Sequence, residues 1–150
     1  MFFLCSIFVK KSLIRFVHDN FLTLSEADLA QWLNQIAAKE GYTVKELEYN
    51  FVDKDTMLAL NQKQLNHNTH TDIITFDYSE TKEIIAEAYI SCYALSKNAK
   101  KYDQTIDNEC LRLLCHALLH CFGFNDKSRE QKEQMRSKEE TYINLFHVKH

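Results

Sequence analysis

The stretch from His116 to Asp126 constrains this chain more than any other, because two histidines stand four residues apart in an apolar segment with helical periodicity. Residues i and i+4 of a helix lie on the same face, so the two imidazoles form a chelating pair. Gly123 follows, at a position where glycine can take the left-handed conformation that ends a helix and turns the chain back. Asp126 can then approach the imidazoles of His116 and His120.

Two imidazoles and one carboxylate are three zinc ligands that leave the fourth tetrahedral position open to water, as in catalytic rather than structural sites. The alternative is that His116 and His120 are core histidines that bond to carbonyl groups among the surrounding leucines. A bare histidine pair would favour that alternative. The glycine and the acid that follow in register favour a site for one Zn²⁺ per chain, held by His116, His120 and Asp126.

Length and composition are those of a folded globular domain. The chain has 150 residues, of which 45% are hydrophobic and 26% charged. This length suffices for one domain with a substantial core. The formal net charge of −3 gives no overall sign of nucleic-acid binding, so a polyanion would have to bind a local patch.

Cysteine usage predicts a reducing, cytoplasmic environment. The five cysteines are odd in number and form no C-x-x-C pair, which argues against a disulfide framework and a four-cysteine zinc site. The apolar run from Met1 to Val9 is too short to span a membrane and lacks the order of a secretory signal. We interpret residues 1–12 as an upstream extension or as the beginning of the first strand.

Strand and helix patterns follow one another along the chain, with no linker or internal repeat. Strands are expected at about 13–21, 46–53, 73–78 and 83–92, and helices at about 26–40, 54–65, 94–101, 108–122 and 128–145. Ser25, Asp107 and either Asp53 or Asp55 are the expected N-caps. These patterns predict one α+β domain over residues 1–150, a small mixed β-sheet packed with helices, with the metal motif on a central helix and a charged helical tail over 128–150.

The motif resembles the metal motif of the YbeY family of bacterial endoribonucleases, whose usual form is H-G-x-L-H-L-x-G-Y-D-H. Upstream, Leu60-Asn61 and the Thr71–Phe76 stretch are similar to that family's L-N and T-D-V-L-S-F segments. Met135 with Glu139 resembles the M-x-x-x-E that follows the motif. The resemblance covers about residues 47–140.

This resemblance implies a zinc-dependent endoribonuclease, specific for single strands, that acts in ribosomal RNA processing at the 3′ end of 16S RNA and in ribosome quality control. It also implies a cytoplasmic protein whose partners are ribosomal RNA and small-subunit ribosomal proteins, with no membrane involved. Zinc at His116, His120 and Asp126 would polarise a phosphoryl oxygen and lower the pKa of a bound water molecule toward about 7.

The chain departs from the family pattern at several positions. Ala117 replaces a glycine, and Asp126 stands where the family has its third metal histidine. Gln64-Leu65 replaces a Tyr-Arg pair, so an arginine expected near the substrate is missing, and Ala86-Glu87 replaces a Gly-Asp pair. Aspartate remains a legitimate zinc ligand, and the site becomes less positive by one charge.

Arg112 offers a replacement for the missing arginine. It lies one helical turn before His116 on the same face, so its guanidinium could reach a phosphate beside the metal. The equally weighted alternative is a salt bridge to Glu109 or another acid. We therefore name Arg112, His116 and His120 as candidate catalytic residues.

Neither a general base nor the RNA contacts lie within the motif. His67 and His70 are candidate bases, with surface histidines as the alternative interpretation. Basic side chains near the site are candidate RNA contacts, although such runs are commonly solvated faces. They are Lys97, Lys100, Lys101, Lys127 and Arg129.

Two other functions fit parts of the pattern. The spacing parallels that of metzincin metalloproteases, but these need a glutamate after the first histidine, and an apolar Ala117 cannot accept a proton. The second is a non-enzymatic protein that binds ribosomal components and uses the metal as a structural staple. Structural zinc is normally four-coordinate, so a fourth protein ligand would favour that interpretation.

Overall fold

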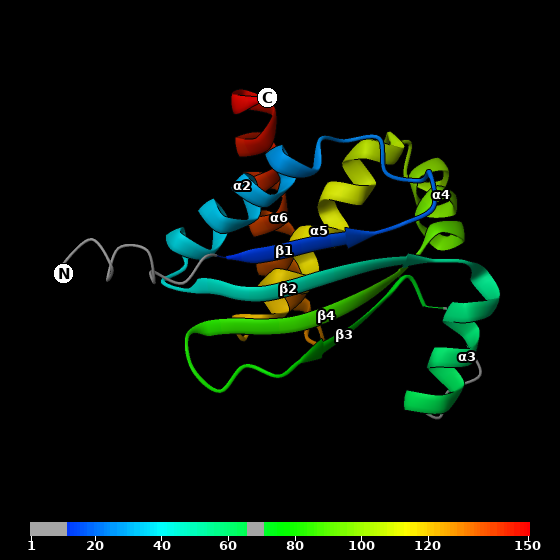
Figure 1. The fold of residues 1–150 in the computed structure, drawn as a ribbon. Helices are drawn as coiled ribbons and strands as arrows, with labels where there is room; N and C mark the ends of the chain where they lie inside the picture. The colour runs from blue at the N-terminus through cyan, green and yellow to red at the C-terminus, as the bar shows by residue number, and fades with distance from the viewer. Residues whose placement is uncertain (1–11, 66–70) are drawn as a thin grey trace.

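The computed structural model of the protein describes residues 12–65 and 71–150 and shows one α+β domain (Figure 1). Four strands and five helices make up this part of the chain. In chain order they are β1 (Leu13–Val17), α2 (Glu26–Lys39), β2 (Thr43–Val52), α3 (Lys54–Leu65), β3 (Ile73–Asp77), β4 (Glu83–Ser91), α4 (Cys92–Lys101), α5 (Ile106–Cys121) and α6 (Arg129–Lys149).

The sheet is mixed, as the sequence predicts, and its strand order is β1-β2-β4-β3. β2 pairs in parallel with β1 on one side and with β4 on the other. β3 pairs antiparallel with β4 and forms an edge, with Ile74 opposite Tyr89. The register shifts between Val44 and Glu46, and this bulge lets Val44 and Leu47 both face the core although three positions separate them.

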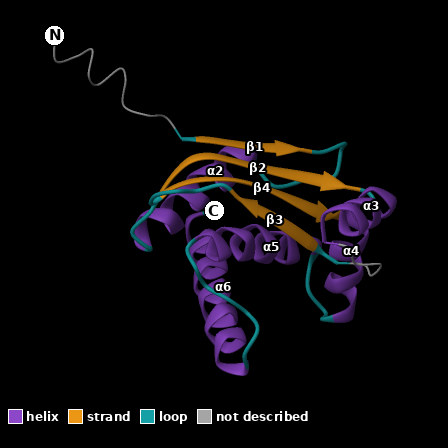
Figure 2. Cartoon of the chain, turned by 90° about the horizontal axis from the view of Figure 1, so that it is seen from below, coloured by secondary structure: helices purple, strands orange, loops and turns teal. Residues whose placement is uncertain are grey.

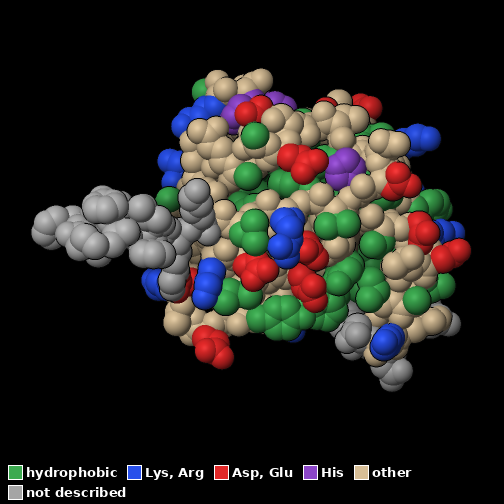
Figure 3. Space-filling view, in the orientation of Figure 1, with side chains coloured by type: hydrophobic (Ala, Val, Ile, Leu, Met, Phe, Trp, Pro, Cys, Tyr) green, Lys and Arg blue, Asp and Glu red, His purple; other side chains and the backbone are tan. Residues whose placement is uncertain are grey.

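Helices cover one face of the sheet. Figure 2 shows α5 and α6 below the strands, with no helix across the middle of the upper face. Alternate residues of β4, from Ile84 to Ile90, are buried against the helices, whereas the intervening residues are partly exposed. On the open face Arg15 pairs with Glu46 and Glu48 at 3.2 and 3.0 Å, and Figure 3 shows side chains of both charge signs side by side there.

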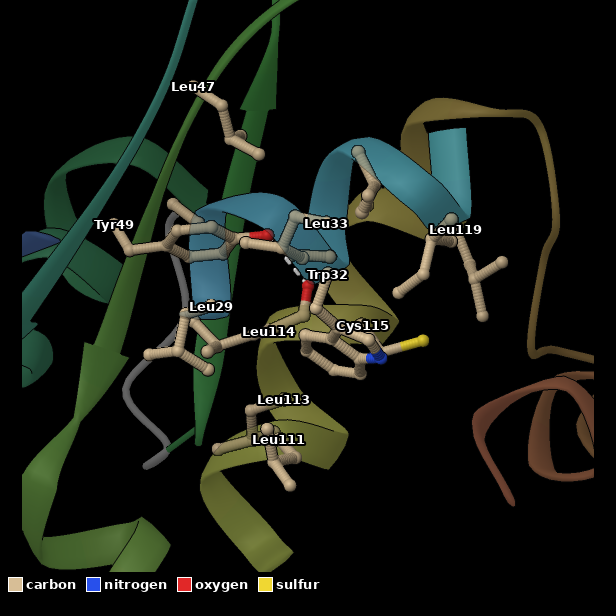
Figure 4. Packing of buried hydrophobic residues seen from close by; sticks show 14 of the residues in the cluster. Leu29, Trp32, Leu33, Leu47, Tyr49, Leu111, Leu113, Leu114, Cys115 and Leu119 are labelled. Carbon is tan, nitrogen blue, oxygen red and sulfur yellow. Dashed lines mark hydrogen bonds between the residues drawn. The ribbon is translucent and has the colours of Figure 1, made fainter. Parts of the chain in front are cut away.

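Helix α5 is the centre of the core and is buried on almost every side. Its leucines and small residues pack between the sheet and helices α2 and α6 (Figure 4). Between Glu109 and Cys121, only Arg112, His116 and His120 are not fully buried. The four-residue spacing places these three side chains in one stripe along the helix. The fold therefore leaves one polar face of its central helix accessible.

Buried hydrogen bonds link the layers around α5. The Tyr49 hydroxyl on β2 donates to the Leu114 carbonyl at 2.7 Å, which Figure 4 draws as a dashed line. Trp32 Nε1 on α2 donates to the Tyr142 carbonyl of α6, also at 2.7 Å. Trp32 is completely buried in the core. These bonds satisfy the polar ends of large aromatic side chains inside the core.

The helix caps agree with the sequence at two positions and differ at one. Ser25 caps α2, and the Asp53 carboxylate accepts from the Thr56 amide at the start of α3. The sequence predicts Asp107 as the cap of α5, and this prediction is wrong: the cap is Thr105, whose hydroxyl accepts from the Asn108 amide. A threonine hydroxyl caps as an aspartate does, and it lies before Ile106, where the helix begins. Asp107 instead accepts a hydrogen bond from Thr23.

The first strand ends earlier than its apolar pattern predicts. β1 stops at Val17, because Asn20 takes a positive φ of 52° and the His18 ring accepts hydrogen bonds from the amides of Phe21 and Leu22. β2 begins three residues before the expected position, and the tail helix continues to Lys149. Across residues 12–65 and 71–150, no helix combines the length and apolar character needed to cross a membrane.

Replacing Tyr49 by phenylalanine tests the link between β2 and α5. The change removes the hydroxyl that bonds to Leu114 inside the core and leaves the ring in place. We expect the free energy of unfolding in urea to fall by about 1 kcal/mol. The matched change Tyr93→Phe, at an exposed ring, should alter it by less than about 0.5 kcal/mol. Equal effects of the two changes would contradict a role for the buried bond.

Candidate metal centre

His116 and His120 lie at the carboxyl-terminal end of α5, on its accessible stripe. Their rings are nearly perpendicular, at 82°, with centroids 4.5 Å apart. The two Nε2 atoms are 3.0 Å from each other. The side chains are 13% and 30% exposed, respectively. The helix therefore directs both ring nitrogens at one point, as the i,i+4 spacing predicts.

The turn after α5 brings Asp126 to the same point. Gly123 has a φ of +97°, a conformation that an L side chain rarely adopts. Its amide donates to the His120 carbonyl, and the Phe124 amide donates to the Leu119 carbonyl, which together form a Schellman motif. Asp126 Oδ2 then lies 3.3 Å from His116 Nε2 and 3.7 Å from His120 Nε2. The glycine thus has the role that the sequence predicts for it.

The three donor atoms fit a tetrahedral metal ion. Ligand atoms lie about 2.0–2.2 Å from zinc, so two of them on a tetrahedron are roughly 3.3 Å apart. The three separations here are 3.0, 3.3 and 3.7 Å. Among the residues that the structure describes, no fourth histidine, cysteine or acidic residue joins this group. Asp126 is 42% exposed, so the side of the group opposite the helix is open to solvent.

Glu139 of α6 holds the other nitrogen of His116. Its carboxylate lies 2.6 Å from His116 Nδ1 and is almost completely buried. A carboxylate on Nδ1 fixes the tautomer that leaves Nε2 free for a metal. The sequence motif M-x-x-x-E contains Glu139 but does not assign it a role. The sequence feature that indicates a role for Glu139 is its position: it is an acidic residue on the buried face of α6, between Met135 and Tyr142.

Arg112 makes the salt bridge that was the alternative to a phosphate contact. Its Nε and one terminal nitrogen donate to the two oxygens of Glu109 at 2.9 and 2.7 Å. Asp72 and Glu139 lie 3.5 and 3.8 Å from the guanidinium. The hydrogen bonds from Arg112 to Glu109 raise the pKa of the arginine above its usual range. The guanidinium thus neutralises buried acids and supports Glu139, and its contact with a phosphate stays a prediction.

Burial shifts the pKa values of ionisable groups around the candidate metal centre. It lowers the pKa of His120, and the neighbouring His116 lowers it further, which favours the neutral imidazole that binds metals. Burial raises the pKa of the Cys121 thiol to about 12 and that of Cys115 well above its usual range. Both thiols are therefore protonated at neutral pH, and neither belongs to the group of potential ligand atoms formed by His116, His120 and Asp126.

The other candidate residues are not among the three donors. Lys127 precedes α6, where Arg129 pairs with Glu133 at its first turn. Lys97, Lys100 and Lys101 lie on α4. His67 and His70 fall outside the described residues, as do the side chains of Gln64 and Leu65.

Ala117 points away from the candidate centre. It is completely buried in the core, between the two histidines in sequence but on another face of α5. A metzincin protease has its glutamate base at this position. The geometry therefore gives no support to peptide hydrolysis by that mechanism.

Curated relatives of the chain share a single description. One from Cytophaga hutchinsonii is 42% identical over 120 residues, covering 79% of this chain and 84% of the relative. Another from Flavobacterium johnsoniae is 36% identical over 137 residues, covering 91% and 99%. Both are described as Endoribonuclease YbeY.

A solved structure has the same fold. The solution structure of a Thermotoga maritima protein superposes with a TM-score of 0.66 and 23% sequence identity, and the match covers 89% of each chain.

The family match extends over nearly the whole described chain. Residues 13–147 match the family described as Endoribonuclease YbeY, and these residues include the histidine pair, Asp126 and Glu139. The match thus runs from β1 to the last turns of α6 and encloses the candidate metal centre. The chain belongs to the YbeY family of endoribonucleases, which are metal-dependent hydrolases.

Proposed function

We propose that the protein is a zinc-dependent endoribonuclease that cleaves single-stranded regions of ribosomal RNA, matures the 3′ end of 16S RNA and takes part in ribosome quality control. In this proposal it works in the cytoplasm, together with small-subunit ribosomal proteins. The observation that carries the proposal is the convergence of His116, His120 and Asp126 on one point beside an open surface. Family membership supports RNA as the substrate.

In the proposed site His116, His120 and Asp126 hold one Zn²⁺ per chain. The bound ion supplies Lewis-acid polarisation of a phosphodiester and acidifies a water molecule. The chain's own residues position these ligands. Glu139 fixes the ring of His116, while Arg112 neutralises Glu109 and lies near Glu139. None of the described side chains is assigned as the general base. His67 and His70, which lie outside the described residues, stay candidates.

A purely structural metal is the less favoured alternative. Structural zinc sites normally use four protein ligands, whereas the described part of the chain supplies three. Asp126 and His120 are partly exposed, which leaves the group accessible to a substrate. These features support a catalytic rather than a structural ion.

Removing a ligand should abolish zinc binding and RNA cleavage together. We expect about one zinc per chain in the wild type, and loss of most of it in His120→Ala and Asp126→Ala, because each change leaves two ligands. Cleavage of single-stranded RNA should fall by about 100-fold or more. Metal analysis and an RNA cleavage assay on the same samples measure both quantities.

The matched control is His18→Ala, which removes a histidine that also pairs with a carboxylate but lies far along the chain from the site. This variant should keep its zinc and its cleavage rate. If wild type carries zinc but cuts no single-stranded RNA, the proposed chemistry is wrong. If the ligand variants keep both zinc and cleavage, the ligand assignment is wrong.

Replacing Glu139 by glutamine tests the support of His116. The amide has nearly the same shape but loses the charged acceptor that holds Nδ1. Zinc affinity should fall by about 10- to 100-fold, measured by competition with a chelator, and added zinc should restore much of the activity. Glu130→Gln, at an exposed position of the same helix, should leave affinity unchanged. A Glu139→Gln protein that binds zinc as tightly as wild type would contradict this role.

A further inference from the structure

A cavity of about 750 Å³ lies between α4, α5 and α6, beside the candidate metal centre. Its lining includes Arg112 and Asn108, which lie one and two turns before His116 along the accessible side of α5. Glu139, which holds the ring of His116, also lines the cavity. Through Arg112 and Glu139 the cavity adjoins the candidate metal centre, while His116, His120 and Asp126 themselves lie outside its lining.

The lining has the chemistry that recognises a flat, neutral, hydrogen-bonding group. Four side-chain amides face it, and each amide offers both donors and acceptors. They are Asn98, Gln104, Asn108 and Asn144. Tyr102, whose ring lies at the end of α4, also lines it and is 60% exposed. Proteins read unpaired RNA bases with this combination of aromatic stacking and hydrogen bonds to base edges.

The charge of the cavity disfavours a phosphate inside it. Four carboxylates line the cavity against two guanidinium groups. Arg112 is already shared among Glu109, Asp72 and Glu139. A phosphate would therefore meet net repulsion, whereas a nucleobase carries no charge and its amino groups can donate to carboxylates.

Lysine side chains lie just outside the cavity, where the phosphates on either side of a bound base would lie. Asp72 and Asn98 line the cavity and also a second hollow of about 500 Å³, which Lys54, Lys97 and Lys101 share. None of these lysines forms an ion pair with a residue in the described ranges. The ammonium groups of Lys54 and Lys97 lie 4.5 and 5.8 Å from the ring centre of Tyr93. Unpaired lysines beside an exposed tyrosine are typical of surfaces that bind single-stranded nucleic acid.

We propose that the cavity binds one unpaired base of the single-stranded RNA substrate, and that Lys97 and Lys101 at its edge bind the adjoining phosphates. This inference rests on the proposed function, because it takes RNA as the substrate. An acidic protein segment would also bind the lysines, but it has no flat heteroaromatic group for the cavity. The base site would fix where an RNA strand lies relative to the metal centre.

The test compares the binding of a short single-stranded RNA, made cleavage-resistant by 2′-O-methyl groups, to full-length variants by fluorescence anisotropy. Tyr102→Leu removes the ring, and Asn144→Trp fills the cavity from an exposed position. Lys97→Gln combined with Lys101→Gln removes two cations. Circular dichroism and melting curves check that each variant is folded.

Matched controls change the same residue types elsewhere. Tyr78→Leu removes a similarly exposed tyrosine, whose hydroxyl bonds to Glu87 on the open face of the sheet. Lys45→Gln combined with Lys149→Gln removes two exposed lysines outside both hollows. Both control proteins should bind the RNA as wild type does.

The two kinds of variant should differ in their salt dependence. Tyr102→Leu and Asn144→Trp should bind about tenfold more weakly with an unchanged slope of log affinity against log salt, because no phosphate contact is lost. The double lysine variant should also bind more weakly, with a slope shallower by about 1.4, since each phosphate contact on a single strand contributes about 0.7. In cleavage of unmodified RNA, the Tyr102 and Asn144 variants should raise KM with kcat nearly unchanged.

The outcomes separate this inference from the proposed function. If wild type cuts RNA but Tyr102→Leu and Asn144→Trp bind it as tightly as wild type, the base site is wrong, whatever the lysine variants do. If wild type never cuts RNA but these variants lose binding as expected, the base site stands and the proposed cleavage fails. Equal weakening by Tyr78→Leu would also overturn the base site.

Discussion

The packing of α5 under the sheet is the constraint on which the rest of the structure depends. This helix is buried by β-strands on one side and by α2 and α6 on others, so nearly all its side chains are apolar. Only a stripe with four-residue spacing remains accessible, and it carries Arg112, His116 and His120. A rigid, buried helix holds its exposed side chains in fixed positions, which metal coordination requires. The core thus determines the geometry of the candidate site.

Buried charge beside the metal centre is balanced within one cluster. Glu109 and Glu139 are both nearly fully buried, and an isolated carboxylate there would be strongly destabilised. Arg112 neutralises Glu109 through two hydrogen bonds and lies within 4 Å of Glu139 and Asp72. The arginine therefore lets α5 and α6 pack closely with acids between them. These contacts account for its place on the stripe, and its contact with a phosphate stays a prediction.

How much the sequence predicts depends on how local each feature is. The three candidate metal ligands follow from helix period and a single glycine, because all three lie within one helix and the turn that follows it. Most element boundaries follow from apolar periodicity, but the Thr105 cap and the early end of β1 depend on individual hydrogen bonds. The contact of Glu139 with His116 joins residues 23 positions apart, so periodicity alone does not reveal it. The amide-lined cavity is formed largely by side chains from three helices, so it too depends on tertiary packing and cannot be seen in the local sequence pattern.

The turn between α5 and α6 has a thermodynamic consequence. Asp126 lies in this connection, and Glu139 lies on α6, so the ligands and their support span both helices. An ion bound here favours only the arrangement in which α6 is docked, and ligand binding to the folded state adds to its stability. At a free metal concentration 100 times the dissociation constant, this linkage contributes about 2.7 kcal/mol. Cellular metal supply would thereby govern how firmly the carboxyl-terminal helix is held to the domain.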